Sequence, residues 1–338
     1  LGDPCRNPWK RDRTSGGSSA GAGAAVAAGL GPLAHGTDGA GSIRIPASFC
    51  GIVGLKPSLG RVPYAPHADP WAATSHPGPM SRTVRDAALM LQAMAGPDAR
   101  DPLSIDSPPV DYVAACEGDL TGLRLAWSPD LGTGPVEREI VAIVETAARR
   151  FTVLGCTLDA PAIRWPDARG FYTAMWDVTM GTRNYERAQQ RPDWIEPTLM
   201  RMILKAGTMS AITYRQALYE RADYYRSVLA FFEDFDLLLT PTMPAGAWQL
   251  GGGADEGPRT IDGRPVAHLI DRVPFTYPFN ITGQPAITVP CGFTSEGLPI
   301  GLQIIGRWHD DALVLRAAAC FETIAPWAEQ KPALLLTP

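Results

Sequence analysis

Apolar residues along the 338-residue chain recur in two alternating patterns, short continuous runs and longer segments with a helical spacing. The clearest helical segment is 136–151, where Ile140, Val144, Ala147 and Phe151 share one face. Helices are predicted over 20–30, 81–94 (with Ser81 as its cap), 136–151, 170–233 and 312–324. Strands are predicted over 33–36, 42–45, 51–55, 123–127, 153–158, 236–239, 285–290 and 301–305. This alternation predicts an α/β fold with a mixed, mainly parallel β-sheet core surrounded by α-helices.

Composition adds limits on function. Apolar residues make up 45% of the chain and charged residues 19%, which favours a large buried core. A net charge of −5 offers no basic surface for a nucleic-acid partner, and the longest apolar segments are too short to cross a membrane. The six cysteines are scattered without a CxxC pair, so neither structural zinc nor a disulfide framework is indicated. We therefore expect a reducing compartment and a cytoplasmic location.

The chain shows no internal repeat, and we interpret residues 1–338 as a single domain. The aromatic- and methionine-rich region 165–233 is interpreted as a helical excursion from that domain. The sequence begins with Leu1 in the middle of a motif, so we expect that an N-terminal segment of the domain is missing.

Two glycine-rich loops carry the candidate chemistry. The stretch "GTDGAGSIRIP", residues 36–46, has three glycines in six residues and then a single serine, Ser42. Such a loop can direct backbone N–H groups toward a carbonyl that the serine attacks, although a plain tight turn explains the glycines equally well. The stretch "GGSSAG", residues 16–21, holds two more serines. Helix capping accounts for one of these hydroxyls but not for two serine loops that enclose one helix.

With both loops considered together, residues 16–58, "GGSSAGAGAAVAAGLGPLAHGTDGAGSIRIPASFCGIVGLKPS", closely resemble the amidase signature family. The resemblance continues through "FDLLLTPTMP" (235–244) and "NITGQPAITVPCGFTSEGLPIGLQIIGR" (280–307). It covers nearly the whole chain and is weak only in the helical region. It implies the amidase signature fold and hydrolysis of linear amides through a serine acyl-enzyme, with no metal or organic cofactor.

The resemblance also implies a Ser–cis-Ser–Lys triad. Its nucleophile corresponds to Ser42 and its bridging serine to Ser18, which lies 24 positions earlier and follows a cis bond after Gly17. The oxyanion hole corresponds to the backbone N–H groups of Gly39, Ala40, Gly41 and Ser42. Ala40 departs from the glycine that is commoner there, and its Cβ restricts φ.

The base of the family is a lysine several tens of residues before the serine pair, and this chain begins too late to contain it. Of the four lysines present, Lys56 belongs to the signature but is expected to make structural hydrogen bonds, and Lys10 is expected to be solvated. The 338 residues alone are therefore expected to lack the activating base.

Residues around the serines are expected to support the loops. A buried ion pair or hydrogen-bonded network is expected for Asp38 and Arg44, while Ser19 and Thr37 should satisfy backbone groups. Most aromatic stripes such as "FYTAMWDVTM" (171–180) belong to a core, but this region of the family often borders the acyl pocket. Met175 and Trp176 are therefore expected at the wall of a pocket for an apolar or aryl amide.

Other interpretations have less support. A G-x-S-x-G nucleophile elbow centred on Ser19 lacks the preceding strand, and His35, the nearest histidine, is expected to pack in the core. The dinucleotide-binding motif G-x-G-x-x-G is not matched, because Gly21 and Gly23 would need a third glycine at position 26, which is Val26. An amidotransferase A-type subunit working in a complex stays open, although Ile45 replaces the glutamine usual there and favours a free-standing amidase. Carbamates and nylon-type oligoamides also stay open as substrates, and a homodimer is a possible assembly.

Overall fold

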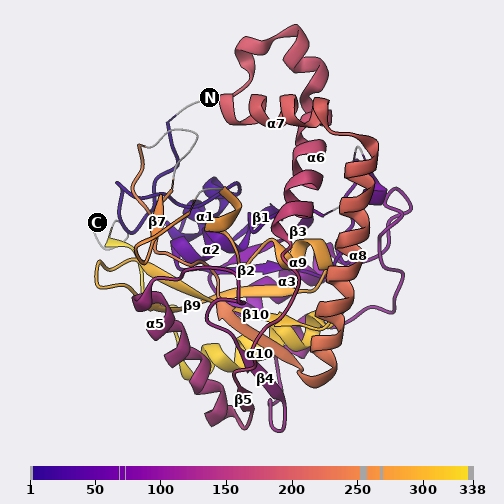
Figure 1. Ribbon diagram of the computed structural model, residues 1–338. Coiled ribbons are helices and arrows are strands. Elements are labelled where there is room, and N and C mark those ends of the chain that lie inside the picture. The colour runs from indigo at the N-terminus through magenta and orange to yellow at the C-terminus, as the bar shows by residue number, and fades with distance from the viewer. Residues whose placement is uncertain (1–2, 68, 73, 252–256, 267–268, 334–338) are drawn as a thin grey trace.

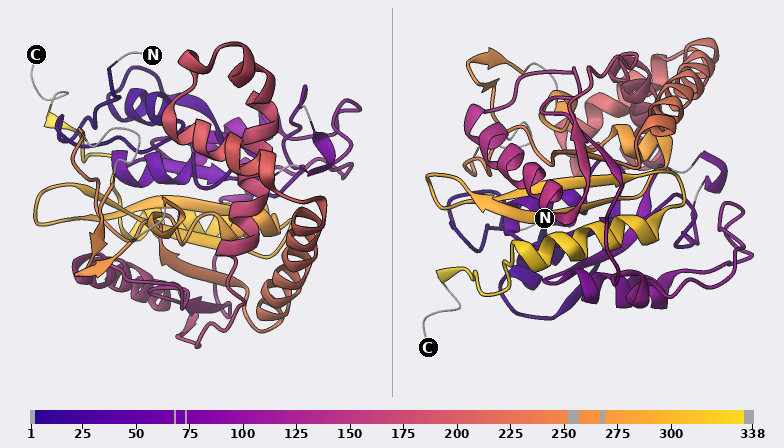
Figure 2. Two further views of the ribbon diagram at one scale, coloured as in Figure 1. Left: turned by 45° about the horizontal axis from the view of Figure 1, so that its top comes forward. Right: turned by 90° about the horizontal axis from the view of Figure 1, so that it is seen from below.

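The computed structural model describes residues 3–67, 69–72, 74–251, 257–266 and 269–333. Their centre is an eight-stranded sheet in the order β1-β3-β2-β9-β10-β6-β4-β5, with helices on both faces (Figures 1 and 2). The strands are β1 Leu33–Asp38, β2 Val53–Lys56, β3 His76–Ser81, β4 Arg124–Trp127, β5 Thr157–Asp159, β6 Leu237–Pro241, β9 Ala286–Phe293 and β10 Pro299–Gly306. A separate two-stranded ribbon pairs β7 Thr260–Ile261 with β8 Arg264–Pro265. The helices are α1 Ala20–Ala27, α2 Arg44–Cys50, α3 Val84–Met94, α4 Tyr112–Ala115, α5 Arg138–Arg149, α6 Arg169–Gln190, α7 Pro197–Thr208, α8 Ala211–Asp234, α9 Pro278–Thr282 and α10 Asp311–Ile324.

The α/β class and the mixed sheet are confirmed, but the expectation of mainly parallel pairing is wrong for the strand neighbours. In the described sheet only β4 is paired in parallel, with β5 and β6. The other neighbouring pairs are antiparallel. The turn 294–298 between β9 and β10 is too short for the crossover that parallel strands require, and this explains that pair.

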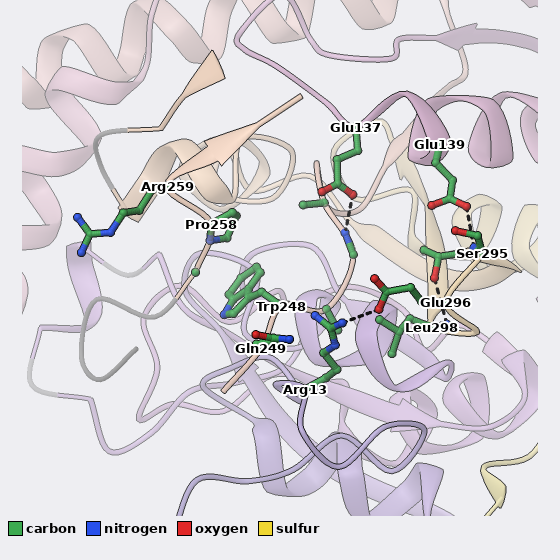
Figure 3. Close-up of a pocket in the computed structure, with 15 residues that line it drawn as sticks. Arg13, Glu137, Glu139, Trp248, Gln249, Pro258, Arg259, Ser295, Glu296 and Leu298 are labelled. Atoms are coloured by element: carbon green, nitrogen blue, oxygen red, sulfur yellow. Dashed lines mark hydrogen bonds and ion pairs between the residues drawn. The ribbon is translucent and has the colours of Figure 1, made fainter. Parts of the chain in front are cut away.

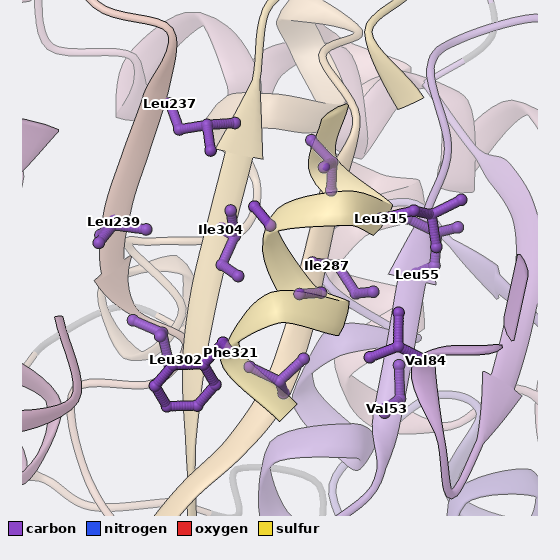
Figure 4. Packing of buried hydrophobic residues seen from close by; sticks show 14 of the residues in the cluster. Val53, Leu55, Val84, Leu237, Leu239, Ile287, Leu302, Ile304, Leu315 and Phe321 are labelled. Atoms are coloured by element: carbon purple, nitrogen blue, oxygen red, sulfur yellow. The ribbon is translucent and has the colours of Figure 1, made fainter. Parts of the chain in front are cut away.

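Alternation along the strands divides the core between the two faces of the sheet. Leu237, Leu239 and Ile304 pack with α3, α5 and α10 on one face (Figure 4). Their neighbours Leu238 and Ile305 pack with α6, α8 and α9 on the other. Since successive side chains of a strand point to opposite faces, each strand stabilises both layers. Burying each such aliphatic side chain completely stabilises the folded state by about 1.5–3 kcal/mol.

Residues 42–45 were predicted as a strand, but Arg44 and Ile45 begin helix α2. The β-like Ile-Arg-Ile pattern is overridden by the Asp38 carboxylate, which accepts hydrogen bonds from the Ile43 and Arg44 N–H groups. These are donors at a helix start that have no partner within the helix. The local sequence therefore continues into a helix and leaves Ser42 at the junction between β1 and α2.

Three further elements differ from expectation. Strand β3 was not predicted, because "HPGPMS" has two prolines and a glycine, yet it pairs with β1 along six residues. Helix α3 begins at Val84 rather than at the predicted Ser81, since the Thr83 hydroxyl accepts from the Asp86 N–H at 3.2 Å and caps it. The predicted strand 153–158 is reduced to β5, because residues 150–154 extend the preceding helix as a 3₁₀ turn.

Candidate active site

The two serine loops lie against each other. The Ser19 N–H donates to the Ser42 carbonyl oxygen at 3.3 Å. The Ser19 hydroxyl lies 3.4 Å from both the N and the O of Thr37, so it joins the loops and does not cap α1. The Gly17–Ser18 peptide bond is cis, as the resemblance implies. Ser18 and Ser42 both line a cavity of about 670 Å³.

A buried ion pair organises the loop before Ser42, as the sequence predicted. Arg44 donates to both Asp38 oxygens at 2.9 Å, and both side chains are fully buried. Asp38 also accepts from the Gly41 N–H at 2.6 Å. Burial alone would raise the pKa of Asp38, but Arg44 and hydrogen bonds hold it well below its usual range. The carboxylate therefore stays charged and fixes the backbone from β1 into α2.

Side chains from distant segments fix three consecutive carbonyl groups of this loop. Asn280 donates to the Asp38 oxygen at 2.6 Å, Tyr172 to the Gly39 oxygen at 3.2 Å, and Thr276 to the Ala40 oxygen at 2.6 Å. In a trans peptide the N–H of the following residue points opposite to the carbonyl. These contacts therefore set the directions of the Gly39, Ala40 and Gly41 N–H groups.

The four predicted oxyanion donors are not equivalent. The Gly41 N–H is already used by Asp38. Within the described part of the chain, no acceptor pairs with the N–H of Gly39, Ala40 or Ser42. The geometry thus favours Gly39, Ala40 and Ser42 as oxyanion donors and argues against the predicted donor role of Gly41. Gly41 instead shapes the turn, with a φ of +120°.

The cavity has a largely aromatic and aliphatic wall. Its apolar lining comes from Tyr172 and Trp176 on α6, Met202 on α7, and Ile45, Trp248, Ile270 and Val273. Trp176 thus lies where the sequence predicted. Met175 does not line the cavity; it is buried in the core with Phe171 and Tyr172. Neighbouring positions on a helix point about 100° apart, and here Met175 is turned toward the core while Trp176 faces the cavity.

The lysines of the chain occupy separate environments. Lys56 is fully buried and donates to the Pro57 and Gln284 carbonyls, the structural role predicted for it. Lys10 pairs with Glu296, and its side chain is 39% exposed. Lys205 lines the cavity and forms an ion pair with Asp177 at 2.9 Å. Neither Lys10 nor Lys56 lines the cavity that holds Ser42.

A second cavity, of about 470 Å³, is mainly polar and shares Trp248 with the first (Figure 3). Glu137 accepts from the Gly246 N–H there, Glu139 from the Ser295 N–H, and Arg13 pairs with Glu296. None of the predicted site residues lines it. His35 is exposed on β1, so the expectation that it packs in the core is wrong.

The described part of the chain meets the requirements of neither a metal site nor a membrane-spanning helix. There, no three His, Cys, Asp or Glu side chains are arranged to hold a metal ion. Over the same ranges, no helix is long and apolar enough to span a membrane.

Comparisons with known proteins identify the family of the chain and support its fold. The family model described as Amidase matches residues 2–315. An acylamidase of Rhodococcus erythropolis is 42% identical over 98% of this chain and 70% of its own length. The A-type subunit of the glutamyl-tRNA(Gln) amidotransferase of Roseiflexus castenholzii is 35% identical over 97% of this chain and 70% of its own. The crystal structure of a bacterial aryl acylamidase superposes with a TM-score of 0.93 at 32% identity, covering 99% of this chain and 71% of that one.

Proposed function

The chain belongs to the amidase family and is an amide hydrolase, and we propose that Ser42 is its nucleophile and Ser18 the group that relays the proton. The observation that carries this assignment is the loop before Ser42. Three of its carbonyls are fixed by Asn280, Tyr172 and Thr276. The N–H groups of Gly39, Ala40 and Ser42 are left without protein acceptors in the described chain. This is the arrangement that a tetrahedral oxyanion requires.

In the proposed reaction, a neutral lysine takes a proton from Ser42 through the Ser18 hydroxyl. The Ser42 oxygen forms a bond to the amide carbonyl carbon, and the negative charge develops on the carbonyl oxygen. Ser18 then passes a proton to the leaving nitrogen as the C–N bond breaks. Water hydrolyses the resulting ester by the same proton path in reverse.

The resemblance supplies the lysine, and we assign it to none of the four lysines of these 338 residues. The Lys56 ammonium is enclosed by carbonyl groups away from the cavity. Lys205 forms an ion pair with the Asp177 carboxylate at 2.9 Å.

The substrate proposed is an apolar or aryl carboxamide. The wall formed by Tyr172, Trp176 and Trp248 supports this, since aromatic rings stack on an aryl group and bury it. The similarity to an aryl acylamidase structure supports the same class. A cytoplasmic location is proposed with it, because all six cysteines are unpaired thiols.

A role as the A-type component of an amidotransferase is the second candidate, because a protein of that kind is also among the relatives. Ile45 favours the free-standing amidase. It is only 7% exposed and lines the cavity beside Ser42, where it extends the apolar wall. A hydrolysis rate that needs no partner protein would support the first candidate.

The test is release of aniline from acetanilide by the purified full-length enzyme. Ser42→Ala should abolish turnover. Tyr172→Phe keeps the ring but removes the hydrogen bond to the Gly39 carbonyl, which orients the Ala40 N–H, so kcat should fall about tenfold while KM changes little. A Tyr172→Phe enzyme with wild-type kcat would contradict the proposed role of the loop 39–42.

A further inference from the structure

Residues of helix α7 line the same cavity as Ser18 and Ser42. The helix lies above the sheet at the top of Figure 1. Thr198, Arg201, Met202 and Lys205 all line the cavity, and their spacing places them on one face of the helix. On its other side α7 packs on α6. A Cβ at Gly181 would lie 2.5 Å from the Ala206 Cβ, so the two helices approach as closely as glycine permits.

Within this wall, Asp177 on α6 is a carboxylate in an unusual position. It is 4% exposed, and among the described residues that line the cavity it is the only acidic one. Its Oδ2 lies 2.9 Å from the Lys205 Nζ, yet in the described chain no donor reaches this buried oxygen with hydrogen-bond geometry. A buried carboxylate with so little compensation is costly to keep for stability alone.

The same geometry defines what Lys205 presents to a ligand. Its side chain is 59% exposed, and its ammonium nitrogen lies 2.9 Å from the Asp177 Oδ2. An ammonium group has three donors, so those not held by Asp177 are available to a bound molecule. Trp176, the residue before Asp177, lies beside the loop 39–42. A Cβ added to Gly39 would lie 3.3 Å from the ring of Trp176. Ser42, Trp176 and Lys205 all line this one cavity, so an aryl group bound against Trp176 shares it with both of the other residues.

We propose that Lys205, positioned by Asp177, binds a carboxylate that the substrate carries at the end remote from the scissile amide. This inference rests on the proposed function and narrows it to amides of anionic, carboxyaryl amines or similar carboxylate-bearing compounds. Lys205 is then a specificity-determining residue and Asp177 its positioning residue.

The experiment compares kcat/KM of the full-length enzyme for 4-acetamidobenzoate and for acetanilide, which differ by one carboxylate. In Lys205→Met the ratio of kcat/KM for the anionic substrate to that for the neutral one should fall about fivefold, mainly through a higher KM for 4-acetamidobenzoate. In Asp177→Asn the ratio should fall toward that of Lys205→Met, because Lys205 loses the carboxylate that positions it. Lys10→Met changes the net charge equally but lies outside the cavity, so it should leave the ratio unchanged.

A Lys205→Met ratio equal to that of the wild type, or an equal loss with both substrates, would overturn the inference and leave the pair as a helix contact. The neutral substrate separates the two proposals. If acetanilide is hydrolysed but the ratio does not respond to Lys205, only the carboxylate subsite fails. If neither compound is hydrolysed by the wild type, the proposed function fails first.

Discussion

Gly41 is the position at which a single added methyl group tests the loop most severely. Its φ is +120°, a conformation that alanine adopts only at a cost of about 1–3 kcal/mol. A Cβ there would lie 2.5 Å from the Thr276 Oγ1 and 2.8 Å from the Ile45 Cδ1. Thr276 cannot move aside without losing its 2.6 Å hydrogen bond to the Ala40 carbonyl. With overpacking included, Gly41→Ala should lower the free energy of unfolding by about 3–6 kcal/mol.

The assay is urea unfolding followed by tryptophan fluorescence, together with acetanilide hydrolysis below the transition. Gly21→Ala is the matched control, because Gly21 is exposed on α1 with no atom within 4 Å of an added Cβ. That control should leave stability unchanged or raise it by about 0.5–1 kcal/mol. A Gly41→Ala protein that unfolds within about 1 kcal/mol of the wild type and retains its activity would refute the description of this loop.

Three further changes test the surroundings of the site. Asp38→Asn leaves Arg44 buried without a counter-charge and should lower the free energy of unfolding by about 3–5 kcal/mol. Because the pKa of Asp38 is depressed in the folded state, the wild type loses stability as pH falls below about 4, and this loss should be smaller in the variant. Burial holds the pKa of His76 well below its usual range, so wild-type stability should decline as pH falls below about 6.5, and urea titrations at pH 7 and 5 should show a shallower decline in His76→Asn. Trp176→Ala should raise KM for acetanilide with little change in kcat, whereas Met175→Leu, which alters only the core, should leave both constants near wild type.

Much of the site could be predicted from the sequence because its parts are local. Ser42, Asp38 and Arg44 lie within seven residues, and the Ser18 loop is separated from them by one helix and one strand. The glycines and the turn that they form are visible in the chain itself. The same locality explains why the Asp38–Arg44 ion pair could be predicted without any knowledge of the tertiary structure.

The groups that aim the loop could not be predicted, because they come from distant segments. Tyr172 is 133 residues from Gly39, Thr276 is 236 from Ala40, and Asn280 is 242 from Asp38. Only the packing of α6 and α9 over the sheet brings them together. The strand pairing could not be predicted for a similar reason. The sequence of β3 is rich in proline, and this segment becomes a strand only because it lies between β1 and β2. The resemblance over 280–307 marked Asn280 as part of a motif but did not reveal its partner.

The assignment of the nucleophile is tested best by identifying the residue of the full-length enzyme that reacts with a fluorophosphonate. Intact mass and peptide mapping should show one adduct, on Ser42, which disappears in Ser42→Ala while circular dichroism confirms that the variant is folded. An adduct on Ser18 or Ser19, or labelling that persists in Ser42→Ala, would contradict the assignment of Ser42 as the nucleophile.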